Sequence, residues 1–479
     1  MNYQIIVYIV GWILEICSVL MLVPAVTALV YHETAGFSFL ITIIVCSIAG
    51  FVIIRRKPSK RAFYAREGLV TVALSWIVLS ITGAIPFVLN GSIPNPVDAV
   101  FETVSGFTTT GASILADVES LPRCVLIWRS FSHWIGGMGV LVFILCLLPL
   151  TGGYQMNLMK AESPGPSVSR LVPKVRSTAI ILYKIYMILT LLEIGFLLAG
   201  GMPMFETLCT AFGTAGTGGF GFLNDSFASF SSYIQIVVTV FMLLFGVNFN
   251  VYFLITIRKF RPALLVEELR YYALIILVAT GLITWNVHHL FSGIGTALKH
   301  SAFQVATIIT TTGFSTTDFD LWPGFSKTIL VLLMFCGACA GSTGGGIEVS
   351  RLAILFKTVR KEIQIYLHPN AVKKIKMDDK MIPHEVIRAT NIFMVVYIFI
   401  FCGSVLLVSL DNLDMTTNFT AVAATFNNIG PGLSQVGPSC NFGLLSPFAK
   451  IVLIFDMLAG RLEIFPILML FVPSTWRKF

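Results

Sequence analysis

Charged residues are scarce in this chain. Only 12% of the 479 residues are Asp, Glu, Lys or Arg, whereas 56% are hydrophobic and the mean hydropathy is +0.86. A soluble domain carries about 25% charged residues. The shortage excludes one large soluble core. Apolar stretches of about 20 residues recur along the chain, so we predict an all-α integral membrane protein with many spans.

Catalytic motifs are also missing. The chain contains no H-E-x-x-H, no G-x-S-x-G and no Walker Gly-Lys-Ser/Thr sequence, which are typical of metalloproteases, serine hydrolases and nucleotide-binding loops. The nine cysteines lie mostly in apolar stretches, and Cys336 and Cys339 form a single C-x-x-C with no second pair. We therefore expect that the protein is not an enzyme and that this chain holds no cofactor.

Basic residues are unevenly placed along the chain. Apolar stretches fall near 3–30, 37–54, 68–89, 124–148, 178–200, 232–257, 271–291, 326–356, 387–409 and 447–472. If the first of these ten spans starts in the cytoplasm, the inner connections carry 25 of the 32 Lys and Arg residues: 55–67, 151–177, 258–270, 351–388 and 473–479. The positive-inside rule then predicts cytoplasmic N- and C-termini. Membrane topology thus explains the net charge of +8, and we expect no nucleic-acid partner.

Acidic residues gather in the opposite, outer connections: Asp98, Asp117, Glu119, Asp225, Asp318, Asp320, Asp411 and Asp414. A negative outer vestibule would raise the local concentration of cations. The alternative is that outer loops keep acids simply because basic residues are excluded from them.

Four shorter, semi-polar segments resemble one another. They read FETVSGFTTTGAS (101–113), CTAFGTAGTGGFG (209–221), FQVATIITTTGFS (303–315) and TAVAATFNNIGPG (420–432), and their glycines align without gaps at Gly111, Gly219, Gly313 and Gly430. Each segment follows one span and precedes another. A repeat therefore contains two full spans, and it enters and leaves the membrane on the same side. Ordinary Thr- and Gly-rich loops would not explain four aligned copies.

The repeats predict a pore for a small cation. Each segment is too short to cross the bilayer, which indicates a re-entrant half-helix followed by an extended stretch. Four such stretches around an axis would supply rings of backbone carbonyls that replace the hydration shell of an alkali cation. The fold class is therefore four span–pore-helix–span repeats around a pseudo-fourfold axis, with two extra N-terminal transmembrane helices.

Two further features interrupt apolar stretches. The run from Gly341 to Gly346 divides a stretch (326–356) that is long for one straight span, and its three consecutive glycines disfavour a helix by about 1 kcal/mol each. A broken helix that faces the pore is one reading, and a packing kink is the other. Arg461 lies in the last span, where a charge needs partners; Asp456 and Glu463 are nearby candidates for an ion pair.

With these motifs, the chain resembles the Trk/Ktr/HKT superfamily of potassium transporters. The segments TTTGAS, TGGFG, TTTGFS and NNIGPG look like its four filter loops. Further matches are RSFSHWIGGMGVLV (129–142), GACAGSTGGGIEVSR (337–351) and DMLAGRLEIFP (456–466). The resemblance runs from about residue 68 to the end, and the two spans before it are similar to those of the longer bacterial TrkH/TrkG branch.

The resemblance implies potassium uptake across the bacterial cytoplasmic (inner) membrane by a homodimer, with a cytoplasmic TrkA-like nucleotide-binding ring that controls gating. Any nucleotide would bind the partner, and potassium would be cargo. Glycine at all four aligned positions points to potassium rather than sodium, although the second and fourth loops depart from T-T-G. The implied filter residues are Thr109, Thr110 and Gly111; Thr217, Gly218 and Gly219; Thr311, Thr312 and Gly313; and Asn428, Ile429 and Gly430.

The resemblance also implies a gate below the filter. Its residues would be Gly341, Ser342, Thr343, Gly344, Gly345, Gly346 and Arg461, with Arg461 projecting into the pore as an electrostatic barrier. The predicted units are 1–67 (two N-terminal helices and a basic loop), 68–150, 151–257, 258–356 with the glycine-rich loop, and 357–479 with the arginine. A sodium- or proton-coupled potassium symporter remains the alternative to a channel-like pore.

Overall fold

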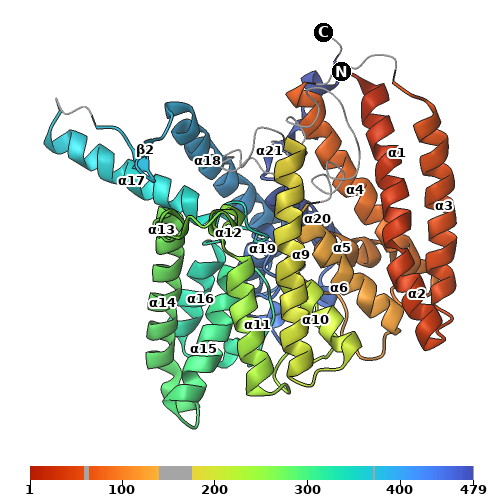
Figure 1. Cartoon of the computed structure of the whole chain (residues 1–479), viewed down its shortest axis with the longest axis horizontal. Coiled ribbons are helices and arrows are strands. Elements are labelled where there is room, and N and C mark those ends of the chain that lie inside the picture. The colour runs from red at the N-terminus through yellow and green to blue at the C-terminus, as the bar shows by residue number, and fades with distance from the viewer. Residues whose placement is uncertain (59–63, 140–174, 370–372, 478–479) are drawn as a thin grey trace.

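The computed structural model of the chain describes residues 1–58, 64–139, 175–369 and 373–477, and Figure 1 shows their arrangement. Within these residues the structure is helical apart from one small antiparallel hairpin. Its strands are β1 (Lys376–Met377) and β2 (Lys380–Met381). The predicted all-α class is confirmed for this part of the chain.

Two N-terminal spans precede the repeats. The first combines α1 (Tyr3–Leu20) with α2 (Leu22–Tyr31), and the second is α3 (Gly36–Arg55). They pack together along one flank of the molecule. After α2, the carboxylate of Glu33 accepts bonds from the amides of Arg123 (2.7 Å) and Cys124 (2.9 Å). These spans are therefore joined directly to the first repeat.

Four times, a long helix is followed by a shorter helix and then by a further helical element, which is interrupted in the second, third and fourth repeats. The repeats are α4 (Ala65–Leu89), α5 (Pro96–Phe107) and α6 (Arg123–Gly137); α9 (Val175–Ala199), α10 (Met204–Gly216) and α11 (Ser232–Phe245) with α12 (Phe249–Thr256); α14 (Glu267–Val287), α15 (Ile294–Ile309) and α16 (Gly324–Met334) with α17 (Val349–Leu367); and α18 (His384–Val408), α19 (Met415–Phe426) and α20 (Pro447–Arg461) with α21 (Phe465–Phe471). Short elements connect them: α13 (Phe260–Leu264), η1 (His288–Leu290), η2 (Phe319–Leu321), η3 (Ser409–Asp411), η4 (Ser434–Val436), η5 (Phe442–Leu444) and η6 (Pro473–Trp476).

In the second and fourth repeats the second element departs from the predicted continuous span. In the described residues six helices are long and apolar enough to cross a membrane, or up to seven if the bent pair α11–α12 counts as one span. The predicted break within 326–356 is present between α16 and α17. The continuous spans predicted at 232–257 and 447–472 are wrong, and most of the stretch 138–148 lies outside the described residues.

The local backbone at these two unexpected breaks shows how each helix ends. Helices α11 and α12 meet at 89°, and the side chain of Asn248 accepts a bond from the amide of Asn250 (2.9 Å) to start α12. Helix α20 ends because Glu463 and Ile464 adopt φ values of +57° and +69°, which a helix cannot contain. Of the predicted unit boundaries, 356/357 falls inside α17, 67/68 falls inside α4, and 150/151 lies outside the described residues.

The two ends of the chain lie at the same end of the molecule (Figure 1). Helix α17 and the hairpin extend from the bundle toward that end, whereas α10 and α15 occupy the opposite half. The basic groups Arg55–Lys57, at the end of α3, and Arg258–Arg261, between α12 and the start of α13, lie at helix ends on the terminal side. The arrangement agrees with the predicted sidedness of the basic connections.

Candidate functional site

Each of the four short helices α5, α10, α15 and α19 ends in the same backbone motif. One or two residues after the helix end, a residue is left-handed in all four: Thr109 (φ +57°), Thr217 (+53°), Thr311 (+57°) and Asn428 (+55°). The next amide then bonds a carbonyl five residues earlier: Thr110 to Ser105 (2.9 Å), Gly218 to Gly213 (2.9 Å), Thr312 to Thr307 (2.8 Å) and Ile429 to Ala424 (2.8 Å). This is a Schellman ending. Four sequence-distant segments thus share one conformation.

The four aligned glycines close a ring. All four have positive φ, from +74° at Gly219 to +103° at Gly430. A Cβ on each glycine would come closer than 3.0 Å to the carbonyl oxygen that precedes the next glycine: Gly111 to Gly218, Gly219 to Thr312, Gly313 to Ile429, and Gly430 back to Thr110. The predicted filter residues of all four loops are therefore brought together around one axis, with backbone oxygens packed between them.

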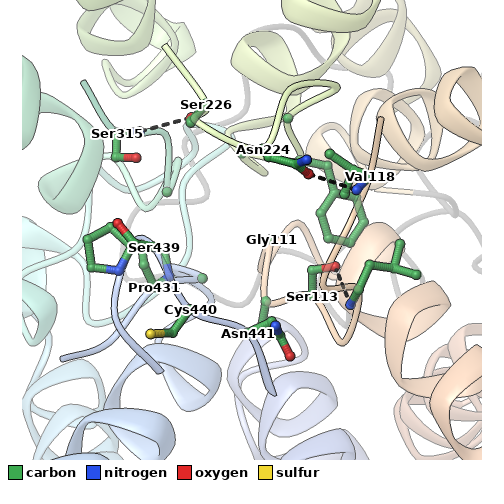
Figure 2. Close-up of a pocket in the computed structure, with 18 of the residues that line it drawn as sticks. Gly111, Ser113, Val118, Asn224, Ser226, Ser315, Pro431, Ser439, Cys440 and Asn441 are labelled. Atoms are coloured by element: carbon green, nitrogen blue, oxygen red, sulfur yellow. Dashed lines mark hydrogen bonds between the residues drawn. The ribbon is translucent and has the colours of Figure 1, made fainter. Parts of the chain in front are cut away.

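A cavity of about 140 Å³ lies over this ring and is lined mainly by the stretches that follow the glycines. Its walls carry hydroxyl, amide and backbone groups, as Figure 2 shows for Ser113, Asn224, Ser226, Ser315 and Asn441. Among its described lining residues the only charged one is Arg129. None of the predicted outer acids lines this cavity in the described part of the chain, and their effect on the local cation concentration stays a prediction.

The outer acids act in loops and helix ends instead. Asp98 pairs with Lys450 (2.7 Å), and Asp414 accepts from the amide of Thr417 to cap α19. The side-chain amide of Asn224 donates to Asp117 (2.8 Å) and holds the pKa of that carboxyl below its usual value. The pKa of Asp414 is lowered in the same way by the hydroxyl of Thr417. The lowered pKa values keep Asp117 and Asp414 ionised at neutral pH, where they bond residues of the outer loops.

Comparisons with known proteins agree with this geometry. The family described as TrkH, cation transport protein, matches residues 35–478. The chain belongs to the TrkH family. The Trk system potassium uptake protein TrkH of Salmonella typhimurium is 37% identical, and that of Escherichia coli strain K12 is 36% identical; both alignments cover 100% of each chain. The crystal structure of the potassium transporter TrkH from Vibrio parahaemolyticus matches with a TM-score of 0.89 and 34% identity, over 100% of both chains.

In this TrkH-family chain, the second loop departs from T-T-G because a histidine occupies the space. A Cβ on Gly218 would collide with the imidazole of His133. The Nε2 of His133 accepts from the amide of Phe220 (3.3 Å), so its Nδ1 donates to the carbonyl of Gly106 (2.9 Å). His133 thus joins the end of α5 to the second filter loop, a role that the sequence analysis missed.

The fourth loop departs from T-T-G in a different way. The side-chain amide of Asn428 donates to the hydroxyl of Thr110 (2.9 Å) and to the carbonyl of Met457 (3.0 Å). It therefore links the fourth loop to the first loop and to α20. The first and third loops, nearly identical in sequence, repeat the same local bond, from Thr108 to Thr110 (2.8 Å) and from Thr310 to Thr312 (2.7 Å).

A buried ion pair supports the first two loops from outside. Arg129 of α6 pairs with Glu102 of α5 at 2.8 Å, and their side chains are 2% and 0% exposed. The second oxygen of Glu102 accepts from the amide of Ile114 (3.0 Å), and Arg129 donates to the carbonyl of Gly221 (3.2 Å). The guanidinium also lies 4.2 Å from the centre of the Phe220 ring. The stretches that follow both glycines are thereby held in place.

We expect Glu102→Gln to destabilise the protein strongly. Removing one partner of a buried ion pair costs about 3–5 kcal/mol, because the other charge is left uncompensated. Thermal unfolding in detergent, read with potassium flux in liposomes, measures the effect. Glu362→Gln is the control, since Glu362 is 55% exposed in its pair with Lys361 and such pairs contribute about 0–1 kcal/mol. Equal melting of both variants and the wild type would contradict the assigned role.

The glycine-rich loop between α16 and α17 lies against the opposite, α17-facing side of the ring. The carbonyl of Thr343 accepts from the hydroxyl of Thr217 (3.0 Å), and the amide of Gly345 donates to the hydroxyl of Thr311 (2.8 Å). A Cβ on Gly345 would contact Asn428 at 2.9 Å. The loop thus touches the first filter residue of three of the four repeats.

Arg461 lies at the same place. Its guanidinium donates to the carbonyls of Thr343 (3.0 Å), Gly136 (2.6 Å) and Gly137 (2.9 Å). The predicted ion-pair candidates have other partners, since Asp456 accepts from Ser404 (2.6 Å) and Glu463 pairs with Arg351. The last residue of α20 therefore places a positive charge between the end of α6 and the tip of the glycine-rich loop.

Proposed function

We propose that this chain takes up potassium through the axis of the four filter loops. The observation that carries the proposal is the ring formed by the four filter glycines. Each glycine packs against the backbone carbonyl that precedes the glycine of the neighbouring loop. Rings of backbone carbonyls suit an alkali cation because they replace its hydration shell. The curated relatives are potassium uptake proteins, and the family resemblance implies that glycine at all four filter positions favours potassium over sodium. The chain itself carries no catalytic step in this proposal, and potassium is cargo.

The proposed gate consists of residues 341–346 and Arg461. Two observations support it: the loop tip contacts three filter loops, and the guanidinium lies beside that tip. A cation that leaves the filter toward α17 would meet both a backbone obstruction and a like charge. Flow would therefore require the loop and Arg461 to move aside together.

The proposed setting is the bacterial cytoplasmic membrane, with both termini in the cytoplasm. The shared end of the two termini and the basic connections support this orientation. We further propose a homodimer controlled by a cytoplasmic, nucleotide-binding, TrkA-like ring. The name of the relatives, a Trk system protein, supports a multi-component assembly.

Reconstitution tests the proposed function. The purified chain is placed in liposomes with a potassium gradient, and the reversal potential is measured while sodium and proton gradients are varied separately. We expect the reversal potential to follow potassium alone, since a pore couples to no second ion. A reversal potential that shifts with the sodium or proton gradient would support the symporter instead and overturn the pore.

A further inference from the structure

The two strands of chain that flank the glycine-rich loop, residues 337–340 and 347–350, are bonded to each other; we call this place the neck of the loop. The amide of Gly337 donates to the carbonyl of Ile347 (2.8 Å), and the amide of Val349 donates to the carbonyl of Ala338 (3.1 Å). Residues 341–346 therefore leave and rejoin the helix path at nearly the same point. A movement of the loop tip away from the filter must begin at, or strain, this neck.

A single buried carboxylate joins both sides of the neck. Glu268, the second residue of α14, is 3% exposed. Its Oε1 accepts from the amide of Ala340 (2.6 Å), just before the loop, and from the amide of Ser350 (3.2 Å), just after it. Its Oε2 accepts from the side-chain amide of Asn248 (3.2 Å) at the α11–α12 break. Bonds to an ionised acceptor are about twice as strong as neutral ones.

The same helix end is bonded to the surface. The carboxylate of Asp378, in the turn of the hairpin, accepts from the amide of Glu267 (2.8 Å) at the start of α14. Lys357 of α17 pairs with Glu267 and donates to the carbonyl of Lys376 (2.7 Å). The first residue of α14 is thus held by the hairpin and α17, and the next residue holds the loop neck.

The hairpin has room to move. Asp378 and Asp379 are exposed, and both adopt the positive φ of a two-residue hairpin turn. A cavity of about 860 Å³ separates the hairpin from α12, and Glu268 and Asn248 line it. In Figure 1 the hairpin and α17 stand away from the bundle.

We propose that Glu268 is the positioning residue that keeps the glycine-rich loop under the filter, and that the hairpin controls it through Asp378. The proposal rests on the proposed gate. When the hairpin is displaced, the start of α14 moves with it, the carboxylate withdraws from Ala340 and Ser350, and the neck opens. The two amides that lose their acceptor favour a new loop position, in which other groups can bond them.

The experiment is rubidium influx into liposomes that contain the purified full chain. Glu268→Gln keeps the size of the side chain but removes its charge, so we expect influx to rise about tenfold with an unchanged reversal potential. Asp378→Asn is expected to raise influx less. Asp379→Asn, in the same turn, is the matched control and is expected to behave as the wild type. The double variant E268Q/D378N is expected to equal E268Q alone, because both changes act on one neck.

The proposal is overturned if the folded E268Q variant shows the same rubidium influx as the wild type. It is also overturned if the effects of E268Q and D378N on influx add up in the double variant. If E268Q does not fold, Glu268→Asp decides, because it keeps the charge but is one methylene too short to reach both amides; unchanged influx in E268D then overturns the proposal. A wild-type chain without potassium-selective flux would instead overturn the proposed function, so the two failures are distinguishable.

Discussion

Replacing Arg461 with alanine is expected to raise potassium flux about a hundredfold. Two unit charges about 6 Å apart repel by about 3 kcal/mol at an effective dielectric constant of about 20, and that energy corresponds to about a hundredfold in rate. The substitution also removes the bond from the guanidinium to the carbonyl of Thr343 at the loop tip. Both changes act in the same direction, since they lower the barrier and free the loop.

The measurement for Arg461 is single-channel or liposome flux at equal amounts of folded protein. Arg461→Lys is the matched control, because it keeps the positive charge and is expected to keep the flux low. Arg461→Gln separates charge from bonding, since an amide can still donate to Thr343. Wild-type flux in R461A, with unchanged thermal unfolding, would contradict the barrier.

Replacing Gly219 with alanine is expected to lower potassium flux at least about a hundredfold. The added Cβ would collide with the carbonyl oxygen of Thr312, and φ is +74° at this position. A left-handed conformation costs a residue with a Cβ about 1–2 kcal/mol, and the collision forces the neighbouring carbonyl away from its place in the ring. Loss of a preorganised ligand set raises the barrier for a dehydrated ion.

Gly281→Ala provides the control for Gly219. Gly281 lies within α14, where a Cβ would meet nothing within 4 Å. The two variants add the same methyl group to the same chain. We expect rubidium influx to fall only in G219A, and equal influx in both would contradict the placement of the filter.

The filter could be predicted because repetition is visible in a single sequence. Four aligned glycines between apolar stretches already indicate four equivalent units around an axis. The glycine-rich loop and Arg461 could also be recognised in the sequence as interruptions of apolar stretches, because glycine runs and charges are costly inside an apolar helix. The conformation of the loops follows from local sequence, as the shared Thr108 and Thr310 bonds of the first and third loops illustrate.

The breaks after Phe245 and Arg461 could not be predicted, because contacts with residues distant in the sequence accompany both of them. The bend after Phe245 depends on bonds to the glycine-rich loop: Cys339 donates to Gly246 (3.0 Å) and Phe249 donates to Gly341 (3.1 Å). The break after Arg461 depends on the pair between Glu463 and Arg351. In both cases the partner lies about 90 to 110 residues away, so no local pattern in the sequence contains it.

The role of His133 was also missed, although one signal was available. The second loop carries glycine at position 218, where the other loops carry Thr110, Thr312 and Ile429. A missing side chain among otherwise equivalent positions indicates that another group fills the space. Only the structure identifies that group as the imidazole of His133.

The most direct test of a potassium pore at the glycine ring is the anomalous scattering of rubidium in crystals of the chain. We predict a peak on the axis between the carbonyls of Thr110, Gly218, Thr312 and Ile429, and we predict that the peak disappears in the G219A variant. A chain that conducts rubidium but shows its rubidium peak away from this axis would contradict a pore at the glycine ring.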